Sequence, residues 1–193
     1  MIYLFLGLAV IFIANIFIFL KVIKAGKLTS KLVNPLVVSF GIILFILPFL
    51  PQPRFSLNRG ATIALTLASI LLAALGFYLI GGAFITYRRY SIPLTPHNWT
   101  PPKIIDKGVY RIVRHPQFLG GLLAYGGLYL FMRGLFALGI IYPLLVLTLY
   151  IRAYGEERYI LRKKFPQEYS SYQKRVGMLI PKFWHSRNSK SIR

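Results

Sequence analysis

Residues 108–121 read GVYRIVRHPQFLGG, and a long apolar stretch begins where this motif ends. Gly108 follows a polar loop and permits a sharp turn. Pro116 suits the first position of a helix, because its missing N–H would have no partner there. The sequence therefore predicts a helix that starts at Pro116, with His115 at or beside its N-cap. The free N–H groups of such a helix end favour an anion, so this basic entry into an apolar helix is a candidate binding site.

The composition is that of an integral membrane protein. Of the 193 residues, 56% are hydrophobic and only 15% are charged. The net charge of +20 would suggest nucleic acid in a soluble protein, but here it indicates basic loops against anionic lipid headgroups, with no nucleic-acid partner. The absence of cysteine excludes disulfides, thiolate zinc sites and a cysteine nucleophile. The N-terminus has no basic region before its apolar run, so we expect a retained span and not a cleaved signal peptide.

Apolar runs predict the fold. Residues 2–20, 32–50, 61–85, 117–132 and 134–151 are candidate membrane spans. Only one charge separates the last two runs, which are short, so they predict a tight helical hairpin. We therefore expect an all-α integral membrane bundle of five transmembrane helices, in which helices 4 and 5 form the hairpin, and no Rossmann fold. Pro143 is expected to bend the fifth helix.

A nearly bare face is predicted on the fourth span. Gly120, Ala124 and Gly127 fall at positions i, i+4 and i+7. Small residues at this spacing permit close packing against a neighbouring helix. The same spacing would also leave room for a ligand against the backbone, and the sequence alone leaves both interpretations open.

Two polar segments flank the predicted hairpin. Residues 86–114 hold four prolines and form a long connection, which fits a functional loop or a flexible linker. The polar and aromatic residues within this loop fit a binding wall or an ordinary membrane interface: His97, Asn98 and Trp99. Beyond the hairpin, residues at helical spacing predict an amphipathic helix on the membrane interface: Phe165, Tyr169, Tyr172 and Val176.

These segments predict the domain organisation and the membrane topology. Residues 1–85 would form three N-terminal transmembrane helices, residues 86–184 the catalytic part and residues 185–193 a polar tail. Alternate loops place 21 of the 24 basic residues on one side of the membrane. The positive-inside rule then predicts a multi-pass protein with its N-terminus outside or lumenal and its C-terminus in the cytoplasm. The membrane would be the plasma membrane in a prokaryote or the endoplasmic reticulum in a eukaryote.

The acidic residues are few and are concentrated in the second half of the chain: Asp106, Glu156, Glu157 and Glu168. If the fifth helix continues past the membrane, Arg152 and Glu156 lie on one face at i and i+4. This pair fits an interfacial salt bridge, or it could divide the charges of a ligand between guanidinium and carboxylate. The sequence contains no GxGxxG after a strand, no Walker loop, no HExxH and no histidine spacing typical of a metal site.

Three features together resemble one known family. They are the RHP motif followed by an aromatic residue and glycine, the paired glutamates in RAYGEERYIL, and the KKFPQEYSSYQKRV segment. This pattern, over about residues 104–181, is similar to the isoprenylcysteine carboxyl methyltransferase family, whose wider group includes membrane phospholipid methyltransferases. Phe118 stands where that family often has tyrosine, so no hydroxyl is essential there.

The resemblance implies a membrane enzyme that uses S-adenosylmethionine at the cytoplasmic face. By motif, it implies that Glu156 holds the amino group of the cofactor and that Arg152 binds the carboxylate of the acceptor. It also implies that further residues contact the cofactor: Leu94, Thr95, Pro102, Lys103, Ile104, Ile105, Tyr110, His115, Pro116, Gln117 and Phe118.

The implied reaction is methyl esterification of a prenylated cysteine that enters from the bilayer, among membrane lipids and without a metal. A carboxylate with a pKa of about 3.5 is already ionised at neutral pH, so this reaction needs no general base. The alternatives are a phospholipid amine, a thiol or another amphiphile as acceptor, or a non-enzymatic basic membrane scaffold. An amine must lose a proton, and Glu157 is a candidate acceptor for that proton.

Overall fold

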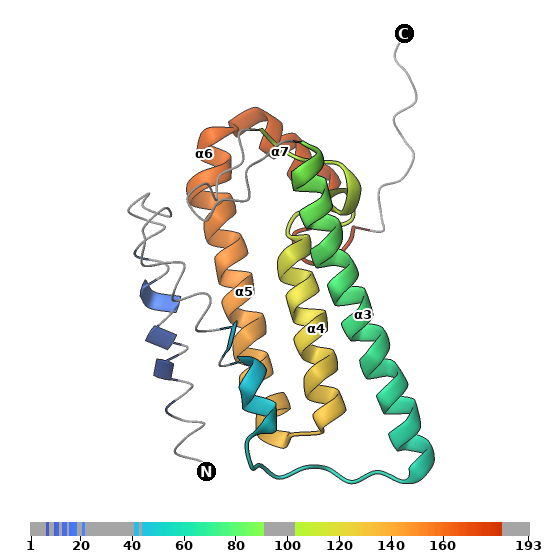
Figure 1. Ribbon diagram of the computed structural model, residues 1–193. Coiled ribbons are helices and arrows are strands. Elements are labelled where there is room, and N and C mark those ends of the chain that lie inside the picture. Colours follow the sequence, from blue (N-terminus) through green and yellow to red (C-terminus); the bar gives the residue numbers. More distant parts are fainter. Residues whose placement is uncertain are drawn as a thin grey trace.

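The computed structural model describes residues 44–90 and 103–182, with scattered positions between 7 and 42. The described elements are η1 (Leu47–Phe49), α3 (Arg59–Arg89), η2 (Gly108–Arg111), α4 (Pro116–Met132), η3 (Ala137–Ile141), α5 (Tyr142–Glu156), η4 (Glu157–Leu161), α6 (Arg162–Lys164) and α7 (Pro166–Arg175). Helices α3, α4 and α5 stand side by side, and α7 lies across one end (Figure 1). The expected all-helical character is confirmed for these residues. Much of the first two predicted spans, residues 91–102 and the tail from 183 lie outside the described part.

Helix α3 is longer than the predicted span, because it continues to Arg89. Asn58 caps its start, where the side-chain Oδ1 accepts a hydrogen bond of 2.8 Å from the backbone N–H of Ala61. Arg88 and Arg89 lie in its last turn, where positive charge is favourable next to the negative end of the helix dipole. Its buried residues form one stripe at heptad spacing: Ser69, Gly76, Leu79, Ala83 and Thr86. The remaining faces expose large apolar side chains, as expected for a helix surrounded by lipid.

Helix α4 begins and ends where the sequence predicts. His115 is its N-cap residue, and Pro116 occupies the first turn. Two of its glycines, Gly120 and Gly127, pack directly on the backbone of α3. A Cβ added to Gly76 would lie 2.5 Å from the carbonyl oxygen of Gly120, and one added to Gly127 would lie 2.5 Å from that of Ser69. The bare face of α4 therefore serves close helix packing, which is the first of the two interpretations of its small residues.

Replacing Gly76 with alanine should destabilise the protein by about 1–3 kcal/mol, because the new methyl group meets rigid backbone and forces α3 away from α4. The measurement is thermal unfolding of the purified protein in detergent. Gly81→Ala is the matched control, because Gly81 lies on the same helix and an added Cβ there has no neighbour within 4 Å. This control should be neutral or slightly stabilising. Equal effects of both substitutions would contradict the tight contact.

The loop before α3 meets the turn between α4 and α5 at one end of the bundle. Arg133 ends α4 in the left-handed conformation, with φ of 57°. The backbone N–H of Leu135 donates to the carbonyl oxygen of Pro53 at 2.9 Å, and that of Ala137 donates to Gln52 Oε1 at 3.0 Å. These two loops therefore lie on one side, as the alternation of basic loops requires. The orientation of that side in a membrane stays a prediction.

The fifth helical region is much longer than residues 134–151. Helix continues without interruption from Ala137 to Lys164 and includes two π-helical turns, η3 and η4. Turn η3 ends at Ile141, two residues before Pro143, the residue expected to bend the helix. Because the helix continues past the apolar run, Arg152 and Glu156 do lie one turn apart on α5. The paired glutamates sit at the junction of α5 and η4.

The prediction for the C-terminal helix is correct in position but wrong in its partner. Residues 166–175 form α7, yet the predicted apolar face, with Tyr169, Tyr172 and Val176, is buried against protein. They form a small core with Ile104 and Phe165 packed against it. The segment before η2 thus supplies the apolar surface that the helix covers.

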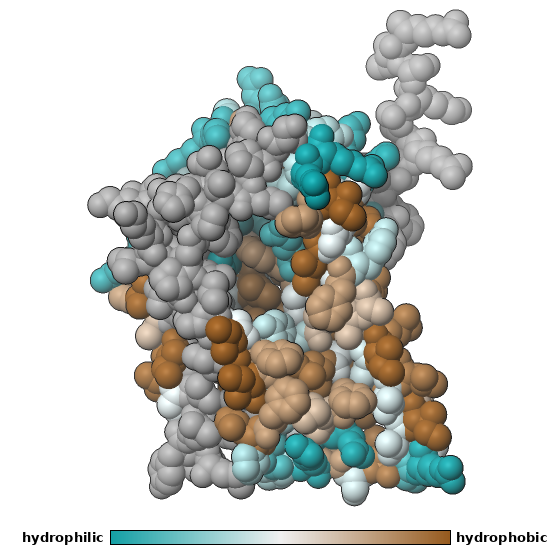
Figure 2. Space-filling model, viewed as in Figure 1, coloured by the Kyte–Doolittle hydropathy of each residue, from teal (hydrophilic) through white to brown (hydrophobic). Residues whose placement is uncertain are grey.

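The described surface fits a membrane protein. Two helical regions are long and apolar enough to cross a bilayer, Arg59–Arg89 and Ala137–Lys164. Figure 2 shows hydrophobic residues gathered along the middle of the visible face and hydrophilic ones towards both ends. The expectation of an integral membrane protein is supported at this level, while the number of five spans stays a prediction.

Candidate functional site

A cavity opens at the end of the bundle where α4 begins. Its walls come from the end of α3, the segment around η2, the first turn of α4, the α5–η4 junction and α7. Most of the residues that the sequence assigned to cofactor binding line it: Ile104, Ile105, Tyr110, His115, Pro116, Gln117, Phe118 and Glu156. The fold therefore brings these eight residues together, although Ile104 and Glu156 are 52 positions apart in the sequence.

Other assigned residues lie elsewhere. Lys103 is not in the cavity wall, and its Nζ lies 4.9 Å from the centre of the Tyr90 ring. The Arg152 guanidinium lies 5.5 Å from the centre of the Phe118 ring, and Arg152 is not in the cavity wall. Leu94, Thr95 and Pro102 fall outside the described residues.

Several residues of the wall were not predicted from the sequence: Tyr87, Arg114, Ile160, Leu161, Tyr169 and Tyr172. The regular spacing of Tyr169 and Tyr172 signalled a buried face, but nothing in the spacing says which surface covers them. Tyr172 donates a 2.6 Å hydrogen bond to the carbonyl oxygen of Tyr110, which fixes α7 over η2. Burial raises the pKa of both Tyr110 and Tyr172, so these hydroxyls stay protonated and act as donors.

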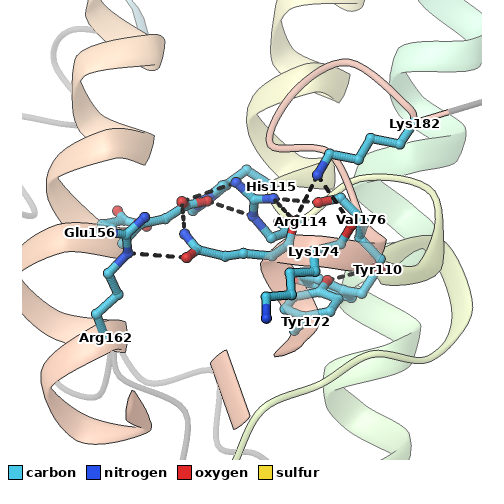
Figure 3. Close-up of polar contacts among 11 residues, drawn as sticks. Tyr110, Arg114, His115, Glu156, Arg162, Tyr172, Lys174, Val176 and Lys182 are labelled. Atoms are coloured by element: carbon cyan, nitrogen blue, oxygen red, sulfur yellow. Dashed lines mark hydrogen bonds and ion pairs between the residues drawn. The ribbon is translucent and has the colours of Figure 1, made fainter. Parts of the chain in front are cut away.

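Glu157 is the centre of a buried ion-pair network. Arg114 grips its carboxylate with two nitrogens, Nε at 2.8 Å from Oε1 and Nη2 at 3.0 Å from Oε2. His115 Nε2 lies 3.1 Å from the same Oε1, and Gln173 also donates to this carboxylate. Arg114 Nη1 continues to the carbonyl oxygen of Val176 (Figure 3). One glutamate thus joins the end of α5 to the RHP turn and to α7.

The backbone reinforces the same junction. The N–H of Arg114 donates to the carbonyl oxygen of Gly177 at 2.8 Å, and the N–H of His115 donates to that of Met178 at 3.2 Å. The RHP turn is therefore held on both its main chain and its side chains. A turn fixed in this way presents the first residues of α4 to the cavity with little freedom.

Glu156 has a different environment from its neighbour. Its Oε2 lies 3.8 Å from His115 Nδ1. Its Oε1 is buried and has no hydrogen-bond partner within the described part of the chain. The side chain lines the cavity. A buried carboxylate oxygen without a partner is costly unless a ligand supplies a donor, so Glu156 is the residue here most suited to bind a cation.

Comparison with known proteins shows which family the chain belongs to. The model of the phospholipid methyltransferase family matches residues 58–168, which is more than half of the chain. The chain belongs to the phospholipid methyltransferase family. No curated protein and no solved structure matches the chain. The resemblance is therefore supported at the level of membrane methyltransferases, while isoprenylcysteine as acceptor is not established by this match.

Phospholipid methyltransferases are membrane enzymes that generally use S-adenosylmethionine. The matched region contains α3, the RHP turn, α4 and the paired glutamates. The cavity fits the charged end of such a cofactor. Glu156 offers an oxygen to an ammonium, and aromatic rings of Tyr87, Tyr110 and Phe118 line the wall, where they suit a positively charged sulfonium.

Proposed function

We propose that this phospholipid methyltransferase family member binds S-adenosylmethionine in the cavity at the start of α4 and methylates the carboxylate of a prenylated cysteine. The observation that carries the choice of acceptor is the position of Arg152. Its side chain is buried, it lies on a helix that is long and apolar enough to cross a bilayer, and it stands one helical turn before Glu156. A buried guanidinium on such a helix is suited to hold the carboxylate of an amphiphile.

Each of the two charged residues has one task in this proposal. Glu156 accepts hydrogen bonds from the ammonium of the cofactor. Arg152 orients the acceptor carboxylate, and Phe118 lies beside its guanidinium. The cofactor, when bound, supplies a methyl group on a positively charged sulfur. Transfer forms a bond between the carboxylate oxygen and the methyl carbon and breaks the carbon–sulfur bond, whose electron pair stays on sulfur.

The acceptor carboxylate is ionised at neutral pH, so no protein residue has to remove a proton. The protein contributes orientation and the exclusion of water from the nucleophile. Glu157 is not needed as a base, and its carboxylate is engaged by Arg114, His115 and Gln173. This engagement supports an acceptor that arrives already deprotonated.

A phospholipid amine is the second candidate acceptor, favoured by the name of the matched family. An amine has to lose a proton, and His115 Nδ1 and Glu156 Oε2, which lie 3.8 Å apart in the cavity wall, are groups that could accept it. The two acceptors give different products. A methyl ester is hydrolysed by mild base and releases methanol, whereas an N-methyl group is stable to the same treatment.

The test incubates the purified protein in detergent micelles with methyl-labelled S-adenosylmethionine and either farnesylated cysteine or phosphatidylethanolamine. We expect label on farnesylated cysteine that mild base releases. Base-stable label on phosphatidylethanolamine would overturn the carboxylate assignment and keep the methyltransferase. If neither acceptor is labelled and S-adenosylhomocysteine does not bind, the proposal that the protein is a methyltransferase would be overturned.

Replacing Arg152 with alanine should raise the KM for farnesylated cysteine about 10- to 100-fold with a smaller change in kcat, because a hydrogen bond to a charged group is lost on binding. Affinity for S-adenosylhomocysteine, measured by calorimetry, is the control and should change little. A second variant, Glu156→Gln, should weaken cofactor binding. If Arg152→Ala weakens cofactor binding by the same amount, the result would instead point to a structural ion pair between Arg152 and Glu156.

A further inference from the structure

A second hollow, the α4–α5 groove, lies beside the cavity. We define it by Leu119 and Leu122 of α4, by Val146 and Tyr150 of α5, and by the segment 177–182 that forms its polar end. The groove has a volume of about 1170 Å³. Pockets for drug-sized ligands measure about 300–1,000 Å³, so the groove has room for a long-chain molecule.

The groove is separate from the route that an acceptor would take to Arg152. Val146 and Tyr150 lie four residues apart on the side of α5 that lines the groove. Arg152 lies two residues beyond Tyr150, which at about 100° per residue places it on roughly the opposite side of the helix. Arg114 lines both the groove and the cavity, and its ion-pair partner Glu157 lines the groove.

The polar end of the groove is basic. Arg162 and Lys182 both line it, and they approach the network of Figure 3 from opposite sides. Arg162 Nε donates to Gln173 Oε1 at 3.1 Å, and Lys182 Nζ donates to the carbonyl oxygen of Gln173 at 2.9 Å. These partners are neutral oxygens. Of the acidic residues in the described ranges, only Glu157 lines the groove, and Arg114 already neutralises it.

We propose that the α4–α5 groove binds an anionic phospholipid. Its acyl chain would lie along Val146 and Tyr150, and its phosphate would lie between Arg162 and Lys182. An apolar wall with cations at one end matches a lipid that carries net negative charge, since each basic residue near an anionic headgroup favours binding. A zwitterionic lipid is a poorer match, because its ammonium would meet the same two cations.

The test titrates delipidated protein in neutral detergent with phosphatidylglycerol and with phosphatidylcholine of the same acyl chains, and follows binding by native mass spectrometry. We expect phosphatidylglycerol to bind the wild type more tightly. The double variant Arg162→Gln, Lys182→Gln should bind phosphatidylglycerol roughly 30-fold more weakly. Lys163→Gln with Lys174→Gln removes the same charge from exposed residues outside the groove and should retain binding.

A steric variant makes the test independent of charge. Val146→Trp fills the groove and leaves both cations in place, so it should also weaken phosphatidylglycerol binding. Thermal unfolding of every variant shows that each is folded. Equal affinity for the two lipids, an equal loss in the Lys163 and Lys174 control, or full binding by Val146→Trp would overturn the proposal. The readout is lipid binding, so it does not depend on the proposed methyl transfer.

Discussion

Replacing Glu157 with glutamine should be among the most destabilising single changes in this protein, at about 3–5 kcal/mol. The carboxylate is buried and holds the charge of Arg114, whose side chain is only 9% exposed. Glutamine keeps the shape but leaves the guanidinium buried without an opposite charge. Because the same carboxylate bonds His115 and Gln173, the junction of α5, the RHP turn and α7 should loosen together.

The measurement is the shift in thermal unfolding of the detergent-solubilised protein relative to the wild type. Glu168→Gln is the matched control, because Glu168 lies in the first turn of α7 and is exposed. That substitution should cost well under 1 kcal/mol. A Glu157→Gln variant as stable as Glu168→Gln would contradict the central role of this carboxylate in the fold.

Replacing Glu156 with glutamine should have the opposite profile, with little effect on stability and a large effect on the cofactor. Its Oε1 makes no hydrogen bond within the described residues, and its Oε2 lies 3.8 Å from His115 Nδ1, beyond hydrogen-bond distance, so glutamine breaks no hydrogen bond that these residues make. A bound ammonium would lose its charged partner, which costs about 2–5 kcal/mol and weakens S-adenosylhomocysteine binding roughly 30-fold or more. Calorimetric titration and thermal unfolding of the same preparation measure both effects.

Two outcomes would contradict this assignment. Unchanged affinity for S-adenosylhomocysteine in a folded Glu156→Gln variant would remove Glu156 from the cofactor site. A loss of stability as large as that of Glu157→Gln would show that Glu156 serves the fold as well. The neighbouring substitution is thus the best comparison, because both variants make the same chemical change one residue apart.

The sequence predicted those parts of the structure that depend on local signals. Pro116 and His115 mark the start of α4, and the small residues Gly120 and Gly127 mark its contact face. The assigned cofactor residues near the RHP motif do gather around one cavity. These features follow from backbone chemistry and side-chain size, which a linear sequence records directly.

Other features depend on contacts between distant segments, and the sequence does not record them. Arg114 and Glu157 are 43 residues apart, and nothing in their spacing indicates a bidentate pair. The stripe on α7 predicts a buried face equally well for lipid and for protein, so its packing near Ile104 could not be predicted. The extension of the fifth helix to Lys164 crosses polar residues, where hydropathy no longer distinguishes a helix from a loop.

The two adjacent glutamates at the end of α5 have different roles, one in holding the fold together and the other in binding a ligand. Glu157 holds three segments of the chain together, while Glu156 lines the cavity and lies 3.8 Å from His115 Nδ1, beyond hydrogen-bond distance. During evolution, substitutions at position 156 could therefore change which ligand binds while the protein stays folded. Position 157 would tolerate far less variation, so evolutionary drift should be uneven across two neighbouring positions of identical chemistry.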